Sequence, residues 1–515
     1  MNKVVHVPNE LNALLDFSLQ AITQGQFSHA LEACEAALRL DANNVDVHHY
    51  LTHVYKGLNR PDLADVMMAR ALQLAPAHAQ INYNAAVDAQ ARGDDNRAML
   101  LYAQALRSQP NFADALWNYG ELLRMSEHFS MAIECFERLV ALGQTHYQGL
   151  WHRMAVCYSS LNRHAETLAM YDKIMSGEHD MLSNWENALY LLSQNDYAKG
   201  SDLYNDRFLC GGRNSVYQHE FAYPLWYGVF KAGATLLLHG EQGLGDELMF
   251  ASMFNELLDA AQKADAQVVI ACKPALVRLF ANSFPQAQVL AHKVGEAPAD
   301  LTGLTIDAQM AMGNLMSLYR RDVDAFAPHR VAYLLPNAER VAYYAQQIEQ
   351  KTSGQRRLRV GLMWGSNPAA VSAKFMKWTA QRSIALPLLA GFADLLDKVE
   401  FVSLQNYERG AEAALVPQLN ILDFSLDQAD FYDTAALVAN LDLVISVDTS
   451  VSHLAGGMAV ETWVPLMSRP DWRHGRERET SIWYDRTRYF RQTKMGEWAD
   501  VIERIHQALR ARVQS

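Results

Sequence analysis

A loop with two glycines and an aspartate is the first place where the chain could do chemistry. It runs His239-Gly-Glu-Gln-Gly243-Leu-Gly245-Asp246, after a short apolar run and before a helical stretch. Gly243 and Gly245 permit close approach of the backbone, and Asp246 stands where the helix begins. We expect Asp246 to be either the N-terminal cap of this helix or a general base. The glycine order does not match G-x-G-x-x-G, and no Lys-Ser/Thr pair follows as in a Walker loop.

A second loop combines hydroxyl groups with an aspartate and a histidine. It reads Ser446-Val-Asp448-Thr449-Ser450-Val-Ser-His453 and also lies between an apolar run and a helical stretch. Hydroxyls and free backbone N–H groups at a helix N-terminus favour phosphate, and the helix dipole adds to this preference. His453, one turn into the helix, could donate to a phosphate oxygen. The loop therefore indicates a phosphate site, and good capping chemistry is its alternative interpretation.

Both loops must be held in place by strands, and the sequence of the second half of the chain predicts such strands. After residue 227, short apolar runs bounded by glycine alternate with helical stretches at 246–263, 274–282, 339–351 and 410–416. Such runs are typical of buried parallel strands. We predict one group of strands near residues 236, 268 and 289, and another near 360, 401, 421, 444 and 463. Two Rossmann-like halves with a ligand cleft at their strand ends are the natural inference.

The first part of the chain repeats with a period of 34 residues, in blocks 11–44, 45–78, 79–112 and 113–146. Small residues recur at two positions of the block: Ala30, Ala64, Ala98 and Ala132, then Ala37, Ala71 and Ala105, with Leu139 in the last. This pattern resembles the tetratricopeptide repeat, with a fifth, weaker unit at 148–175 and a sixth helix pair at 185–208 that we expect to close the solenoid. A generic helical bundle is the alternative.

The resemblance to this repeat implies a concave groove that binds peptides. The matching groove positions are His49, His53, Tyr83, Asn84, Trp117, Asn118 and Glu121. A primary amide both donates and accepts, so Asn84 and Asn118 could hold a peptide backbone, or be ordinary polar surface residues. His49 and His53 have the spacing of two metal ligands, but no third ligand stands nearby in the sequence. We expect groove histidines and no metal.

The composition of the chain excludes several classes of protein. The 515 residues suggest about three domains of ordinary globular composition. A net charge of −12 without any block of basic residues argues against a bulk nucleic-acid or anionic-membrane binder. Five cysteines, none in a C-x-x-C pair, indicate a reducing compartment. The N-terminal residues do not resemble a signal peptide, and no apolar run is long enough to span a membrane, so we expect a cytoplasmic protein.

Taken together, the two loops and several further blocks resemble a known family. From about residue 224 to 512 the chain is similar to heptosyltransferase-type glycosyltransferases of GT-B fold, especially the branch fused to tetratricopeptide repeats. The matching blocks are 238–246, 360–368, 382–384, 401–405, 431–437, 447–454, 471–473 and 481–484. The expected fold is α + α/β, an α-solenoid followed by a GT-B pair of Rossmann-like domains. The expected boundaries are 1–180 for the solenoid, 181–232 for capping helices and linker, 233–338 for the acceptor half and 339–515 for the nucleotide-sugar half.

The resemblance implies an inverting, metal-independent glycosyltransferase with a nucleotide-sugar co-substrate and no other cofactor. Asp246 would be the base that takes the proton of the acceptor hydroxyl. The donor would be bound by Gly243, Gly245, Trp364, Arg382, Gln405, Asp448, Thr449, Ser450 and His453. Among Lys374, Lys377 and Arg382, we favour Arg382 to stabilise the leaving phosphate. The segment between Pro368 and Arg382 departs from the family pattern, which leaves the donor nucleotide and sugar open.

A solenoid ahead of a glycosyltransferase suggests that the acceptor is a protein, modified on Ser or Thr hydroxyls. The same layout occurs in bacterial flagellin glycosyltransferases. The resemblance thus implies flagellin as partner and a CMP-activated nonulosonic acid as donor. Two alternatives stay open. In one, the acceptor is a lipid or saccharide and the repeats are an assembly module. In the other, the protein is an inactive GT-B scaffold. The oligomeric state is left open.

Overall fold

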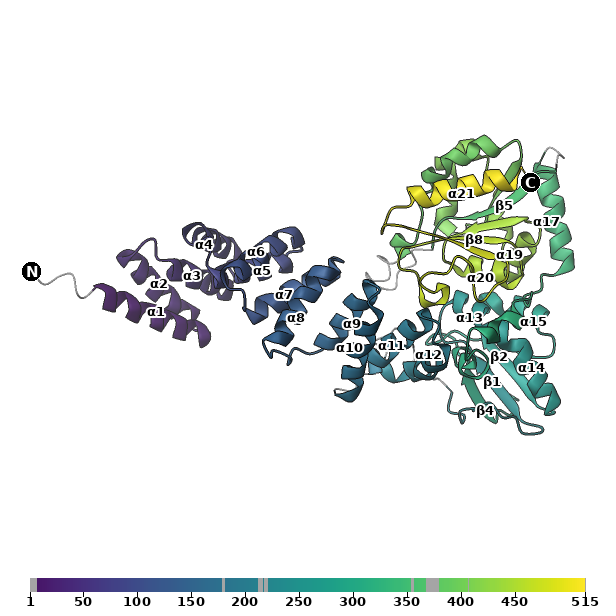
Figure 1. Ribbon diagram of the computed structural model, residues 1–515, viewed down its shortest axis with the longest axis horizontal. Coiled ribbons are helices and arrows are strands. Elements are labelled where there is room, and N and C mark those ends of the chain that lie inside the picture. The colour runs from purple at the N-terminus through teal and green to yellow at the C-terminus, as the bar shows by residue number, and fades with distance from the viewer. Residues whose placement is uncertain are drawn as a thin grey trace, which may run out of the picture. The chain divides into compact units, whose positions relative to one another are not determined.

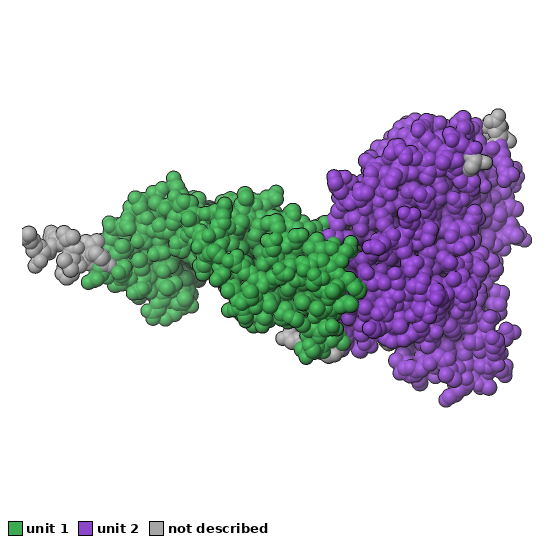
Figure 2. All heavy atoms as spheres, viewed as in Figure 1, with its two compact units in different colours: residues 1–178 green, residues 179–515 purple. Residues whose placement is uncertain are grey.

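The chain divides into two units, residues 1–178 and 179–515, which Figure 2 shows in different colours. The structure is a computed structural model. It describes residues 7–177, 181–211, 216, 221–352, 356–366, 379–405 and 407–514. Across these residues, no helix combines the length and apolarity needed to cross a bilayer.

Unit 1 is a helical-repeat solenoid of successive helix pairs (Figure 1). Helices α3, α5 and α7 begin at residues 45, 79 and 113, which are the first residues of three of the predicted 34-residue blocks. The repeat prediction is therefore confirmed. The helices are α1 (Val7–Thr23), α2 (Phe27–Leu40), α3 (Val45–Gly57), α4 (Pro61–Leu74), α5 (Ala79–Ala91), α6 (Asp95–Ser108), α7 (Ala113–Met125), α8 (Phe129–Ala141), α9 (Leu150–Ser160) and α10 (His164–Ser176).

Small side chains and turn residues in the left-handed conformation allow the two helices of each repeat to pack as a pair. The four alanines at the twentieth block position are almost fully buried, so paired helices approach closely there. Between the helices of a pair, one residue has positive φ in each of the first four repeats: Gly25 (+71°), Asn59 (+56°), Gly93 (+78°) and Glu127 (+67°). These positions are 34 residues apart, and glycine and asparagine are the residues that adopt this conformation most readily. The backbone conformation therefore repeats with the same 34-residue period as the sequence.

Unit 2 contains two parallel β-sheets (Figure 1). The first has strand order β3-β2-β1-β4, and the second β6-β5-β7-β8-β9. Leu237 of β1 stands opposite Val269 of β2 on one side and Gln309 of β4 on the other. The strands are β1 (Thr235–His239), β2 (Gln267–Cys272), β3 (Gln288–Ala291), β4 (Ala308–Ala311), β5 (Leu358–Met363), β6 (Val399–Ser403), β7 (Leu443–Ser446), β8 (Thr462–Leu466) and β9 (Thr487–Arg491).

Helices cover these sheets and join them to the end of the repeats. The pair α11 and α12 belongs to unit 2, where α12 packs against α16 and α11 packs against the 3-10 turn η10 (Trp472–His474). The longer helices of unit 2 are α11 (Met181–Ser193), α12 (Tyr197–Tyr204), α13 (Leu244–Phe250), α14 (Phe254–Lys263), α15 (Val277–Ser283), α16 (Met316–Tyr319), α17 (Ala338–Lys351), α19 (Phe431–Val438), α20 (Ser450–Gly457) and α21 (Ala499–Arg512). The observed architecture is thus an α-solenoid followed by an α/β unit with two sheets.

The strand predictions hold for seven of the eight positions and miss two strands. Residue 421 lies outside any strand, and its neighbour Leu422 forms only an isolated bridge to Val402. Strand β4 was missed because it is only four residues long and includes a polar residue, Gln309, whose side chain bonds His239. Strand β9 was missed because it reads Thr-Arg-Tyr-Phe-Arg at the edge of its sheet, where charged side chains replace a continuous apolar run.

Close packing inside the fourth repeat yields a test that separates packing from helix propensity. A Cβ atom on Gly120 of α7 would lie 2.7 Å from Cε1 of Phe136, a fully buried ring on α8. Alanine is favoured over glycine in a helix by about 1 kcal/mol, whereas overpacking costs about 1 to 3 kcal/mol. We expect Gly120→Ala to lower stability by about 1 kcal/mol, measured as the melting temperature of the first unfolding transition.

The matched control is the double variant Gly120→Ala/Phe136→Leu, in which the clashing ring is removed. If packing decides the outcome, Gly120→Ala costs less in the Phe136→Leu background than in the wild type. A stabilising effect of Gly120→Ala in the wild type would show that helix propensity outweighs overpacking and that the repeat can accommodate the added methyl group.

Candidate functional site

Two helix N-termini from the two halves of unit 2 meet at one cavity. Helix α13 follows β1, helix α20 follows β7, and the two helices pack against each other (Figure 1). The cavity has a volume of about 440 Å³. Its wall is made by Gly243, Leu244, Gly245, Asp246, Met363, Ser366, Arg382, Leu404, Gln405, Phe431, Asp448, Thr449, Ser450, Val451, His453 and Arg473. Both loops singled out in the sequence therefore lie at one place, at the carboxyl ends of strands from both sheets.

Gly245 permits the close approach of these two helices. A Cβ atom at residue 245 would lie 3.0 Å from Cδ2 of His453 and 3.6 Å from Cα of Ser450. The first of these distances is shorter than ordinary van der Waals contact, and the imidazole it meets is buried. Glycine thus lets the first turn of α13 touch the first turn of α20.

Asp246 has both of its carboxylate oxygens engaged. Oδ2 accepts a hydrogen bond from the backbone N–H of Gly243 at 2.9 Å, which caps the first turn of α13. Oδ1 forms an ion pair with the guanidinium of Arg473. The N-cap residue is Gly243, so Asp246 is not the N-cap expected from the sequence but the third residue of the helix, where its carboxylate accepts from the N-cap N–H. The same carboxylate also lines the cavity.

Arg473 is the main residue of the cavity that sequence reasoning missed. Its guanidinium lies between two carboxylates, Asp246 and Asp471, with Nη1 2.5 Å from Oδ1 of Asp471. Burial lowers the pKa of Arg473. Its guanidinium nevertheless forms ion pairs with the carboxylates of Asp246 and Asp471. The block 471–473 was noticed only as part of a family resemblance. Nothing in its spacing indicated that it reaches a loop more than two hundred residues earlier.

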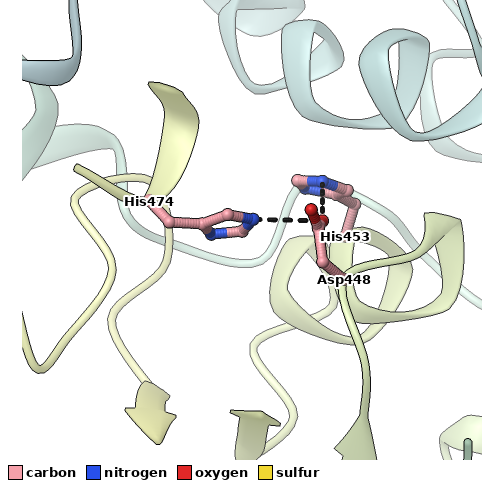
Figure 3. Close-up of side chains that lie close together, drawn as sticks. All are labelled: Asp448, His453 and His474. Atoms are coloured by element: carbon pink, nitrogen blue, oxygen red, sulfur yellow. Dashed lines mark ion pairs between the residues drawn. The ribbon is translucent and has the colours of Figure 1, made fainter. Parts of the chain in front are cut away.

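A second buried cluster consists of Asp448, His453 and His474 (Figure 3). Figure 3 shows the two imidazole rings approaching the carboxylate from different elements, His453 from α20 and His474 from η10. The Nε2 atom of His474 lies 3.0 Å from Oδ1 of Asp448, and that of His453 lies 4.0 Å from the same oxygen. The Nδ1 atom of His453 is 2.8 Å from the hydroxyl of Tyr484, which orients the ring. His474 was absent from the sequence prediction.

The charges of this cluster follow from burial and from its neighbours. Burial would raise the pKa of Asp448, but His474, His453 and Arg382 outweigh it and hold that pKa well below its usual range. Burial lowers the pKa of His453 to about 4 despite the attraction of Asp448. At neutral pH the cluster therefore presents an ionised carboxylate beside a neutral His453 imidazole.

Two imidazoles and a carboxylate are a donor set that a divalent transition metal accepts, and their ligand atoms lie within 4.8 Å of one another. The positive charge of Arg382 acts on Asp448, however, and opposes a cation at this place. The hydroxyls of Thr449 and Ser450 stand at the start of α20 and suit an anion. Arg382 and these hydroxyls thus suit an anion at the start of α20, whereas the ionised carboxylate of Asp448 opposes it.

The remaining donor-side predictions divide into two groups. Arg382, Gln405, Thr449 and Ser450 all line the cavity. Trp364 does not: its side chain is 1% exposed, packs in the core of the second half and donates through Nε1 to Glu412 at 2.8 Å. We therefore assign Trp364 to the core, because an apolar ring directly after a strand is buried by the helices that cover the sheet. Lys374 and Lys377 lie outside the described residues.

In unit 1, the predicted groove residues bond to one another from repeat to repeat. Nδ2 of Asn84 on α5 lies 2.7 Å from Nε2 of His49 on α3, which lies 3.2 Å from Nε2 of His53. One helix pair further on, Nδ2 of Asn118 donates to the hydroxyl of Tyr83 at 3.0 Å. The amides expected to hold a peptide backbone are thus engaged with side chains of the preceding repeat, and a peptide would have to displace these bonds.

The same face continues with an aromatic and charged cluster. Trp117 of α7 stacks on Tyr147 with ring centroids 4.8 Å apart, and the guanidinium of Arg153 lies 4.8 Å from the Trp117 ring. Glu121 forms ion pairs with Arg153 at 2.6 Å and Arg124 at 2.9 Å. All seven predicted groove residues therefore lie on α3, α5 and α7, in three groups of interacting side chains.

Comparison with known proteins gives one relative along most of the chain. Protein FlbA of Caulobacter vibrioides is 27% identical over 507 residues, covering 94% of this chain and 82% of FlbA. The similarity therefore extends through both units. No family model matches the chain.

Solved structures resemble parts of the chain at low identity. PilF of Pseudomonas aeruginosa is 18% identical, covers 40% of this chain and 89% of its own, and has a TM-score of 0.31. MamA is 19% identical, covers 31% and 94%, and has a TM-score of 0.28. YrrB, a TPR protein with an unusual peptide-binding site, is 18% identical, covers 34% and 91%, and has a TM-score of 0.30.

The histidine pair of unit 1 yields a pH test. Burial, followed by the charge of His53, lowers the pKa of His49 to about 4. Between pH 6.5 and 4 the unfolded chain binds a proton that the folded chain excludes. This contribution to stability is therefore present above pH 6.5 and is lost as the pH falls toward 4, by about 2 kcal/mol at pH 5. We expect His49→Gln to flatten the decline of the melting temperature between pH 7 and 5.

The control for this test is His29→Gln, which replaces an exposed histidine of the same unit. This variant is expected to keep the wild-type slope. Parallel slopes for His49→Gln and wild type would contradict the assignment of a buried, neutral His49.

Proposed function

We propose that the chain is an inverting GT-B glycosyltransferase that moves a sugar from a nucleotide-sugar donor to Ser or Thr hydroxyls of a protein acceptor. One observation carries the proposal. A single cavity between two parallel-sheet halves brings Asp246 of one loop together with Asp448, Thr449, Ser450 and His453 of the other. An acidic group opposite an anion-binding helix start is what such a transfer needs, with a base for the acceptor and a site for the leaving phosphate.

The donor phosphate is assigned to the start of α20. The hydroxyls of Thr449 and Ser450 and the backbone N–H groups of the first turn favour an oxyanion there. The neutral imidazole of His453 can donate one further hydrogen bond, because its other nitrogen is already paired with Tyr484. Arg382, in the same wall, supplies positive charge toward the leaving group.

For Asp246 to act as the base, Arg473 must leave it for another anionic partner. While Arg473 pairs with Asp246, the carboxylate is stabilised in its ionised form and is a weak proton acceptor. The donor phosphate beside the guanidinium offers a competing anion in the same cavity. Transfer of Arg473 from the carboxylate to the phosphate would leave Asp246 free to take the proton of the acceptor hydroxyl as its oxygen attacks the anomeric carbon. Donor binding thus prepares the base.

The protein acceptor is assigned to the solenoid, whose groove face on α3, α5 and α7 combines amide, imidazole, aromatic and charged groups. Such a face suits an extended polypeptide with polar side chains. Flagellin is the acceptor that we propose, with a CMP-activated nonulosonic acid as donor, on the ground of the layout described above. The alignment with FlbA through both units is consistent with a solenoid and an α/β unit that function together.

The mechanistic test is Asp246→Asn. Asparagine retains the size of the side chain and a capping oxygen but cannot accept the proton, so we expect transfer to fall by at least about a hundredfold. Binding of the acceptor protein by unit 1 is expected to stay within twofold of wild type. The assay is sugar transfer to purified acceptor, read by mass spectrometry, with acceptor binding measured separately.

Asp259→Asn is the matched control, because Asp259 is exposed on α14 of the same half. Normal transfer by Asp246→Asn would refute the base assignment. Equal loss in both variants would indicate a general effect of the charge change rather than a catalytic one.

The acceptor is tested by intact-mass analysis of flagellin and other secreted proteins from the host, with and without this gene. Loss of a sugar-sized mass from flagellin is the expected result, and the size of the loss identifies the sugar. Unchanged protein masses would overturn the protein-acceptor proposal in favour of a lipid or saccharide acceptor, or of an inactive scaffold.

A further inference from the structure

A second cavity lies at the outer edge of the second sheet and shares no wall residue with the first. Its volume is about 550 Å³. Strand β9, which is an edge strand, forms one side, residues 477–479 form another, and α21 closes the third. The wall consists of Glu477, Arg478, Glu479, Arg488, Tyr489, Phe490, Arg491, Arg504, Gln507 and Ala508.

Four arginines line this cavity, in a chain whose net charge is −12. Arg504 pairs with Asp500 at 3.0 Å. Arg478 instead donates to the neutral amide of Asn195, and Arg488 lies over the ring of Phe490 with its guanidinium carbon 4.7 Å from the centroid. Cation–π contact and amide bonds hold a guanidinium in place without neutralising its charge.

Arg491 is the most deeply placed of the four. Its Nη2 donates to the carbonyls of His474 at 2.7 Å and Arg478 at 2.9 Å, while Nη1 is buried without a hydrogen-bond partner. Burial lowers the pKa of Arg491, which is the signature of a cation removed from water. A buried guanidinium with an open donor is costly unless an anion completes it.

Within the residues that the structure describes, Arg478, Arg488 and Arg491 therefore converge on one cavity with no carboxylate ion pair of their own. Glu477 and Glu479 belong to the same wall but are exposed, so solvent screens their negative charge. The four arginines therefore outnumber the two glutamates, and the wall has a net positive charge.

We propose that this cavity is a second ligand site, which binds a phosphate-bearing small molecule. A planar guanidinium presents paired N–H donors that match phosphate oxygens, and three of them suit an anion with more than one phosphate group. Phe490 forms part of the wall, and the volume of the cavity leaves room for an organic group attached to the phosphates. This proposal stands whether or not the first cavity transfers sugars.

The site has a direct structural link to the first cavity. Arg491 donates to the carbonyl of His474, which belongs to the same turn as Arg473. An anion held by Arg491 would therefore brace the turn that carries Arg473 to Asp246 and His474 to Asp448. Occupancy of the second cavity would favour one arrangement of the first, which gives the ligand a regulatory position.

The test is titration of the full chain with inorganic pyrophosphate by calorimetry, combined with hydrogen exchange to locate the protected segments. We expect pyrophosphate to protect residues 477–491 and the middle of α21, where Arg504, Gln507 and Ala508 line the cavity. Arg488→Glu is the decisive variant, because Arg488 is exposed on an edge strand and can be replaced without disturbing a core. It is expected to weaken binding at this site at least tenfold and to abolish the protection of 477–491.

Arg486→Glu is the matched control. It makes the same change of charge two residues away, at an exposed arginine that is not part of the cavity wall and that faces Glu461. Its affinity is expected to stay within twofold of wild type. Equal weakening in both variants would show attraction by diffuse charge and would overturn the proposal.

The two cavities are distinguished by where protection falls. Protection of 446–454 that survives in Arg488→Glu reports the first cavity and bears on the proposed function alone. Protection confined to 446–454 in the wild type would overturn the second site while supporting a phosphate site in the first. Absence of protection at both places, with pyrophosphate in millimolar excess, would overturn the second site and remove the support that phosphate binding lends to the proposed function.

Discussion

The contact between the first turns of α13 and α20 is the constraint on which the rest of the site depends. The two helices follow strands of different sheets, and the absence of a side chain at Gly245 lets them touch at the ring of His453. With this contact, the N-terminal ends of both helices face one cavity. A side chain at 245 would press on the ring of His453 and work against this approach of the proposed base to the proposed anion site.

Buried charge is balanced within the cavity by a chain of acids and cations. Asp246 and Asp471 share the guanidinium of Arg473. Asp448 is held ionised mainly by His474, with His453 and Arg382 adding to the effect. Removing an ionised group from water is expensive, so each acid needs its partner. In the proposed reaction, the donor phosphate enters this network as a further anion and competes with Asp246 for Arg473. The proposal thus links donor binding to the state of the proposed base.

The solenoid was predictable in detail because its information is local and periodic. Small residues at fixed positions and a left-handed turn every 34 residues recur in the sequence itself, so helix boundaries such as those of α5 and α7 follow. The sheets were less predictable at their edges. Strand β9 carries arginines where an inner strand would carry apolar residues, and edge strands leave no continuous apolar run to recognise.

The sequence by itself determined the repeat, the order of most strands and the two loops that carry Asp246 and His453, because residue type and spacing along the chain encode them. Only the tertiary structure decided which distant groups join those loops. From a turn after β8, Arg473 reaches the cavity wall and His474 reaches Asp448, whereas Trp364 is buried in the core. These outcomes depend on how two sheets and their covering helices pack, and contacts between residues hundreds of positions apart leave no periodic signal in a single sequence.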